Sequence, residues 1–163
     1  MNEQRKTVLD KLNTLGIHYD LIEHPAVYTI EEMERLDIVN KNEIAKNLFL
    51  RDDKKKRYFL LVISKGKQVN LKELSKRINS RPLSFASEEA LNICLGLTKG
   101  SVTPFGILND ESRKIEVMLD KAILSYQQIG VHPNDNTATV FLSLKDLEQV
   151  ISDHGNTYAY IEI

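Results

Sequence analysis

Two apolar runs separated by a short charged segment constrain the fold of this 163-residue chain more than any other feature. The runs cover residues 45–51 and 57–64, and residues 52–56 between them read Asp-Asp-Lys-Lys-Lys. Apolar runs joined in this way are typical of a β-hairpin. Because a hairpin pairs its strands antiparallel, the pattern argues against an all-parallel sheet.

Helical and strand-like segments alternate through the rest of the chain. Helical spacing of apolar residues and capping residues predict helices over residues 3–15, 29–36, 70–78, 87–96 and 143–155. Alternating or β-branched segments predict strands over residues 18–22, 114–119, 138–142 and 158–163. The sequence therefore predicts one mixed α/β (α+β) domain over residues 1–163, with a largely antiparallel central sheet.

Composition places the chain among soluble globular proteins. Hydrophobic residues make up 42% and charged residues 28% of the sequence. No apolar run approaches the roughly 20 residues that span a membrane, and the N-terminus lacks the pattern of a secretory signal. The single cysteine, Cys94, excludes an internal disulfide framework and fits a reducing compartment. We therefore expect a cytoplasmic protein.

Net charge gives no general attraction to nucleic acid, because 22 Lys and Arg residues stand against 23 Asp and Glu residues. The clearest local patch is the basic segment 54–57, which Lys65 and Lys67 follow. Clustered cations of this kind can bind RNA phosphates. A solvated hairpin tip explains the same residues, so both interpretations stay open.

Common cofactor and metal motifs are absent. The four histidines are scattered, and Cys94 has no nearby partner, so no zinc-ligand spacing occurs. The sequence has no Walker motif, no dinucleotide-binding glycine pattern and no Gly-x-Ser-x-Gly motif. We expect neither a metal nor another cofactor.

The segment Gly-Ser-Val-Thr-Pro-Phe-Gly at residues 100–106 has the composition of a rigid loop. Gly100 and Gly106 permit unusual backbone angles, and Pro104 fixes its own φ. Such a loop can aim backbone N–H groups at a developing negative charge, although a tight turn in the core is the simpler interpretation. Ser101 is a candidate nucleophile beside His132, or a residue that only hydrogen-bonds the backbone.

Two further residues carry candidate chemistry. Lys46 stands among apolar strand residues, where it is either a charge at the sheet edge or a cation in a pocket. His132 directly precedes a strand and could orient a ligand or a water near neutral pH, or be a structural histidine.

Three segments together resemble the YbaK and prolyl-tRNA synthetase-associated editing-domain family. They are Lys-Asn-Leu-Phe-Leu-Arg-Asp-Asp at 46–53, Gly-Ser-Val-Thr-Pro-Phe-Gly-Ile-Leu-Asn-Asp at 100–110 and Val-His-Pro-Asn-Asp-Asn-Thr-Ala-Thr-Val at 131–140. The segment His-Pro-Ala-Val-Tyr-Thr-Ile-Glu-Glu at 24–32 fits as well. The resemblance spans essentially the whole chain and looks strongest to the freestanding prolyl-tRNA editing proteins.

The resemblance implies a central, barrel-like mixed sheet surrounded by helices, and it implies site residues. Lys46 would position the terminal phosphate or ribose of a tRNA, with Asn47 beside it. The amides of Gly100, Ser101 and Val102 would face the ester carbonyl, and His132 would lie near the aminoacyl group. The full set of expected substrate-binding residues is Asn47, Val27, Tyr28, Thr29, Thr103, Pro104, Phe105, Val131 and Asn136.

The activity that the resemblance implies is hydrolysis of mischarged alanyl-tRNA(Pro). Alternatives are a deacylase for cysteinyl-tRNA(Pro) or another small aminoacyl-tRNA, and a module that binds aminoacyl-tRNA or a synthetase without catalysis. The expected partner is the acceptor end of tRNA(Pro), with prolyl-tRNA synthetase as a second candidate, and neither a membrane nor DNA is expected. Rejection of proline requires a small pocket, with Val27, Tyr28, Thr29 and Val131 as its walls or as ordinary core residues.

Overall fold

The computed structural model describes residues 2–27, 29–36, 38 and 41–163. In chain order the elements are α1 (Glu3–Thr14), β1 (Asp20–Glu23), α2 (Ile30–Glu34), η1 (Lys41–Glu43), β2 (Lys46–Asp52), β3 (Tyr58–Ile63), α3 (Leu71–Arg77), β4 (Leu83–Phe85), α4 (Glu88–Leu95), η2 (Pro104–Asn109), β5 (Glu116–Asp120), η3 (Lys121–Ser125), β6 (Ile129–Val131), β7 (Ala138–Leu142), α5 (Leu144–His154) and β8 (Tyr158–Ile161). Elements labelled η are short 3-10 helices. The alternation of helices and strands confirms the mixed α/β class.

Capping residues define the starts of the helices as the sequence predicts. The side chains of Thr29, Asn70, Ser87 and Ser143 each accept a hydrogen bond from a backbone N–H in the first turn of the helix that follows. A side-chain acceptor here satisfies one of the N–H groups that a helix start leaves unpaired. All five predicted helices are confirmed, with ends that differ by one or two residues.

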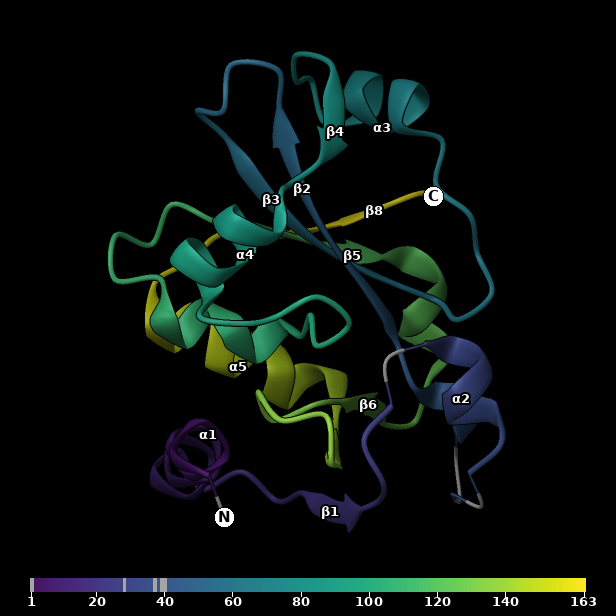
Figure 1. The fold of residues 1–163 in the computed structure, drawn as a ribbon, viewed down its shortest axis with the longest axis vertical. Helices are drawn as coiled ribbons and strands as arrows, with labels where there is room; N and C mark the ends of the chain where they lie inside the picture. Colours follow the sequence, from purple (N-terminus) through teal and green to yellow (C-terminus); the bar gives the residue numbers. More distant parts are fainter. Residues whose placement is uncertain (1, 28, 37, 39–40) are drawn as a thin grey trace.

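A five-stranded sheet, in the order β4-β2-β3-β5-β8, forms the larger layer (Figure 1). β2 and β3 pair antiparallel from Lys46 opposite Ile63 to Arg51 opposite Tyr58, which confirms the hairpin. β4 adds an antiparallel edge strand, whereas β5 and β8 pair parallel. The hairpin therefore places Lys46 at the end of the sheet farthest from the charged tip.

A second, antiparallel sheet contains three strands in the order β1-β7-β6. A single bridge between Ile44 and Gly130 connects it to the chain just before β2. Among the described residues the strands thus form two linked sheets, and the barrel-like closure that the resemblance implies is not shown. The linkage matters because it brings the end of β6 beside the start of β2.

The short strands β4 and β6 are absent from the sequence-based predictions. β6 contains Gly130, a residue with low strand propensity. Its neighbours explain the glycine, because an added Cβ would lie 2.7 Å from the Phe141 ring and 2.9 Å from the Ile44 side chain. Close approach of the two sheets therefore requires glycine at this position.

One large hydrophobic cluster packs against both sheets. It includes Val62 and Val117 from the larger sheet, Ile129 and Val140 from the smaller sheet, and Leu12 from α1. Burial of these side chains is the main contribution that holds the layers together. Within the described part of the chain, no helix is both long and apolar enough to cross a membrane.

Candidate functional site

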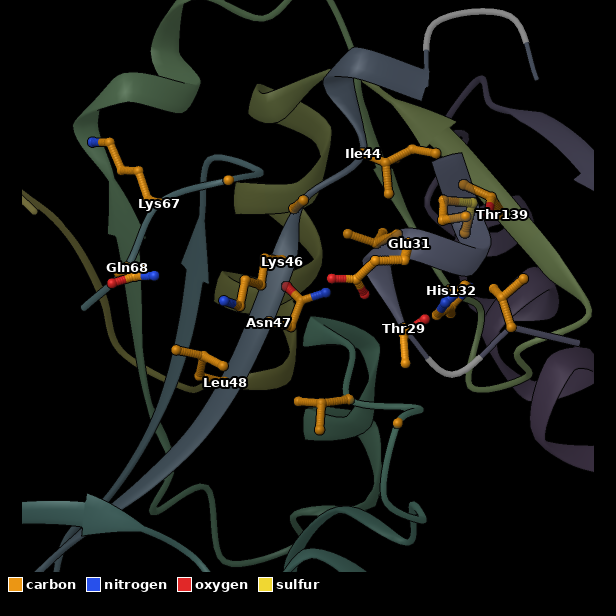
Figure 2. A pocket seen from close by; sticks show the side chains of 18 residues that line it. Thr29, Glu31, Ile44, Lys46, Asn47, Leu48, Lys67, Gln68, His132 and Thr139 are labelled. Atoms are coloured by element: carbon orange, nitrogen blue, oxygen red, sulfur yellow. The ribbon is translucent and has the colours of Figure 1, made fainter. Parts of the chain in front are cut away.

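A cavity of about 480 Å³ opens where the two sheets meet (Figure 2). Its walls come from the segment leading into α2, the start of β2, the loop after β3, the glycine loop before η2 and the end of β6. The lining residues are Val27, Thr29, Glu31, Met33, Ile44, Ala45, Lys46, Asn47, Leu48, Gly66, Lys67, Gln68, Gly100, Val102, Gly130, Val131, His132 and Thr139. The cavity thus collects segments that lie up to about one hundred residues apart in the sequence.

Lys46 and Asn47 are the first residues of β2 and lie in the cavity wall. Both are half-buried. Within the part of the chain that the structure describes, Lys46 forms no ion pair and the buried Oδ1 of Asn47 has no hydrogen-bond partner. Lys46 therefore lies in the pocket wall as a cation without a counter-ion among the described residues.

The glycine loop presents its backbone to the cavity through Gly100 and Val102. Gly100 adopts a left-handed conformation with φ of +84°, which glycine tolerates best. The N–H of Ser101 donates to the Thr98 carbonyl at 3.1 Å, so this amide is already engaged. Gly100 and Val102 line the cavity, and no described residue accepts a hydrogen bond from their N–H groups, so these two amides are the donors that the loop offers.

Three residues expected to contact substrate lie beneath the cavity instead of lining it. Thr103 and Phe105 have no exposed surface, and Pro104 is buried. The Thr103 hydroxyl donates to the His132 carbonyl oxygen at 2.5 Å. These residues support the loop from below.

His132 is held as a neutral hydrogen-bond acceptor. Its Nδ1 lies 2.8 Å from the Ala138 carbonyl oxygen, to which only a protonated nitrogen can donate. Burial lowers the pKa of His132, and the neighbouring His24, whose ring centroid is 6.0 Å away, acts in the same direction. The neutral tautomer with a proton on Nδ1 leaves Nε2 as an acceptor.

The structure does not pair Ser101 with His132 as a nucleophile and base. The Ser101 hydroxyl lies 3.4 Å from the Thr98 hydroxyl, while His132 Nδ1 is bonded to Ala138. Hydrogen-bond contact between nucleophile and base is the mark of such a pair, and none joins these two side chains in the described structure. The structure therefore favours the second interpretation of Ser101, in which it forms hydrogen bonds within the loop and is not a nucleophile.

Of the expected pocket walls, Val27, Thr29 and Val131 line the cavity. Val27 and Val131 are almost fully buried. Asn136 is absent from the lining, and its Nδ2 donates to the Val27 carbonyl at 3.2 Å. Tyr28 lies outside the described residues.

Sequence reasoning missed several residues of the cavity, notably Glu31, Gly66 and Gln68, and it named Lys67 only as part of a basic surface patch. Figure 2 shows the Glu31 carboxylate pointing from α2 toward β2, which carries Lys46. Glu31 follows the helix cap at Thr29, so the capping signal could have placed it near Thr29 but not in a pocket. Lys67 is less available, because its Nζ lies 3.1 Å from the buried carboxylate of Asp120.

Among the described residues, no group of three His, Cys, Asp or Glu side chains is arranged to hold a metal ion. The cavity offers a lysine without an ion pair and two backbone N–H groups without an acceptor, as judged on the described part of the chain, together with a neutral histidine. Groups of this kind can position an activated ester and stabilise an oxyanion without a covalent intermediate.

Residues 24–150 match the family model of the aminoacyl-tRNA editing domain. The chain belongs to this family. It is 50% identical over 161 residues to the prolyl-tRNA editing protein ProX of Acetoanaerobium sticklandii, with 99% of this chain and 98% of that protein covered. It is 36% identical to the prolyl-tRNA synthetase associated domain-containing protein 1 of Mus musculus, with 89% and 88% covered.

A solved structure of a candidate trans-editing enzyme for prolyl tRNA synthetase has the same fold. It superposes with a TM-score of 0.77, covers 100% of this chain and 99% of that one, and shares 22% sequence identity. At this identity the likeness concerns the fold.

Proposed function

We propose that the protein is a trans-editing hydrolase that clears alanine from mischarged alanyl-tRNA(Pro). The observation that carries the proposal is the cavity, which brings Lys46, the Gly100–Val102 loop and His132 together in a member of the editing-domain family. The ProX relative, at 50% identity over nearly the whole chain, supports tRNA(Pro) as the carrier of the substrate.

In the proposed reaction a water attacks the ester carbonyl carbon, and the bond to the ribose oxygen of the terminal nucleotide breaks. The N–H groups of Gly100 and Val102 stabilise the oxyanion, which is the role that preorganised donors serve in acyl transfer. The proton released by the water ends on the departing ribose oxygen, so the products are free alanine and tRNA(Pro). Because the ester is already activated, no nucleophilic side chain is required.

Lys46 is proposed to bind the terminal phosphate or ribose, because a lysine that no described carboxylate neutralises suits a phosphate. The neighbouring ribose hydroxyl of the substrate is proposed to orient the attacking water. This role is tested with alanyl-tRNA(Pro) that ends in the corresponding deoxyribose. An undiminished rate on that substrate would overturn it.

Selection of alanine over proline is proposed to rest on size. Val27 and Val131 are buried walls of the cavity, and in this proposal they exclude the proline ring. Exclusion by shape is needed, because the loss of a methylene group alone discriminates by only about 1 to 3 kcal/mol.

We also propose that the protein works in the cytoplasm and meets prolyl-tRNA synthetase there. The prolyl-tRNA synthetase associated domain named in the mouse relative supports that partner.

The deciding experiment compares hydrolysis of alanyl-, cysteinyl- and prolyl-tRNA(Pro) by the purified protein. We expect rapid release of alanine and retention of proline. Preferred release of cysteine would support the alternative substrate. Binding of charged tRNA without release of any amino acid would overturn the enzyme and support a binding module.

A further inference from the structure

One buried hydroxyl connects the two halves of the site. Thr103 Oγ1 donates to the His132 carbonyl oxygen at 2.5 Å, although the two residues are 29 positions apart. Thr103 has no exposed surface, and it directly follows Val102, which lines the cavity. The bond therefore joins the loop that carries the free N–H groups to the residue that carries the acceptor imidazole.

A second bond runs between the same two segments. Asn134 Nδ2 donates to the Phe105 carbonyl oxygen at 3.3 Å, and Asn134 is itself buried. Asn134 follows His132 by two residues and bonds to Phe105 of η2, whereas Thr103 bonds to His132 itself. Of the two bonds, the shorter one acts at the residues nearest the cavity.

Threonine suits this position on both local and tertiary grounds. Its φ of −151° is extended, which a β-branched residue favours, and its hydroxyl also accepts a long bond from the Phe105 N–H at 3.4 Å. The hydroxyl thus ends the loop as a helix cap and donates its proton across to the His132 turn. Valine keeps the shape without the donor, whereas serine keeps the donor.

We infer that Thr103 is a positioning residue that fixes the separation between the N–H donors of the glycine loop and the His132 side chain. It acts through its neighbours, because a side chain without exposed surface does not touch substrate. The inference rests on the proposed function, in which both groups contact the same aminoacyl ester. A displacement of about 1 Å in such a site can cost about 100-fold in rate.

The test compares Thr103→Val and Thr103→Ser with the control Thr98→Val. Thr98 is an exposed threonine of the same loop, and the Ser101 hydroxyl is the one described group that its hydroxyl bonds. We expect Thr103→Val to lower kcat for alanyl-tRNA(Pro) by about 10- to 100-fold with little change in KM. The kcat of Thr103→Ser and of Thr98→Val should stay within about threefold of the wild-type value. Both variants keep a hydroxyl at residue 103 that donates to the His132 carbonyl oxygen.

The ratio of the rates for alanyl- and prolyl-tRNA(Pro) distinguishes a positioning role of Thr103 from a simple loss of folded protein. Partial unfolding lowers the rates for alanyl- and prolyl-tRNA(Pro) by the same factor, whereas a shifted loop changes their ratio. We expect the ratio to fall in Thr103→Val and to recover in Thr103→Ser. An unchanged ratio and kcat in folded Thr103→Val would overturn the inference.

An NMR readout keeps the inference separate from the proposed function. In ¹⁵N-labelled protein, Thr103→Val should shift the backbone signals of both Val102 and His132, and Thr103→Ser should restore them. If the wild type hydrolyses no aminoacyl-tRNA, the proposed function fails, while these spectra still decide the coupling. Undisturbed Val102 and His132 signals in Thr103→Val would refute the coupling.

Discussion

Lys46 is an unusual residue, since it is half-buried in a cavity wall and no described residue neutralises it. Burial of part of a charged side chain carries a desolvation cost that a counter-ion normally offsets. A phosphate group of the substrate would supply that counter-ion. The lysine is therefore better explained by ligand binding than by stability.

The first prediction concerns this charge. Lys46→Ala should lower kcat/KM for alanyl-tRNA(Pro) by about 10- to 100-fold, the equivalent of one lost charge-assisted hydrogen bond. The circular dichroism spectrum should not change. Lys72→Ala, at an exposed lysine on α3, is the control and should retain full activity. Full activity of Lys46→Ala would remove Lys46 from the site.

His132 gives a pH-dependent prediction. Burial lowers its pKa in the folded state below the ordinary value of 6.5. Below pH 6.5 the unfolded chain therefore binds more protons at this residue than the folded protein does, and the free energy of unfolding falls as the pH decreases. The slope from this one group cannot exceed about 1.4 kcal/mol per pH unit.

Urea denaturation between pH 5 and pH 7.5 measures this effect. His132→Gln should show a flatter dependence of the unfolding free energy on pH than the wild type. The comparison uses the slope, because the substitution also changes the stability at every pH through the bond to Ala138. Equal slopes would contradict a lowered pKa of His132.

At the scale of the element, the glycine loop depends on backbone conformation more than on side chains. Gly100 has a positive φ, and the loop then passes directly into η2 at Pro104. The Ser101 amide closes a turn onto Thr98, which orients the following amides. One amide of the loop thus has a structural role, and two others have no acceptor among the described residues and can bind a ligand.

Gly100→Ala tests this conformation. An alanine in left-handed geometry costs about 1 to 2 kcal/mol, and relief of the strain would turn the Val102 N–H away from the cavity. Gly16→Ala is a matched control, because Gly16 has a φ of +69° and open space around its Cα. Both variants should lose similar stability in urea, but only Gly100→Ala should lose most of its deacylation rate.

At the scale of the whole molecule, the N-terminal helix supports the site from outside the matched family region, which begins at residue 24. Arg5 of α1 is buried and bonds to Asp135 at 2.8 Å, to Glu23 at 2.7 Å and to Thr137 at 2.8 Å. Burial raises the pKa of Asp135, but hydrogen bonds from Thr137 and Arg5 outweigh it and lower the pKa. The helix thereby holds the turn that follows His132.

Arg5→Met should lower the free energy of unfolding at pH 7 by about 3 to 5 kcal/mol, because it leaves the Asp135 carboxylate buried without its cation. The double variant Arg5→Met/Asp135→Asn should recover part of the loss. Lys6→Met, which breaks the exposed pair with Asp10 on the same helix, should leave the stability almost unchanged, because solvent screens an exposed ion pair. A loss of similar size in Arg5→Met and Lys6→Met would show that the buried pair adds nothing.

Local interactions explain what could be predicted from the sequence. A helix cap such as Thr29 and its partner N–H lie three residues apart, and the hairpin strands are joined by a short turn, so both leave a readable pattern. The strands β4 and β6 leave almost no readable pattern. Each has three residues, which is too few to show the alternation of a strand, and their pairing partners lie elsewhere in the chain.

By itself, the sequence determined the helices, the hairpin, the mixed fold class and, through three spaced segments, the resemblance to editing domains. Three facts were decided only by the tertiary structure. The Ser101 N–H donates to the Thr98 carbonyl, Thr103 is buried under the site, and Glu31 lines the cavity. The physical reason is that burial and hydrogen-bond partners depend on which distant segments meet. Here that meeting is the bridge between Ile44, which lies just before β2, and Gly130 of β6.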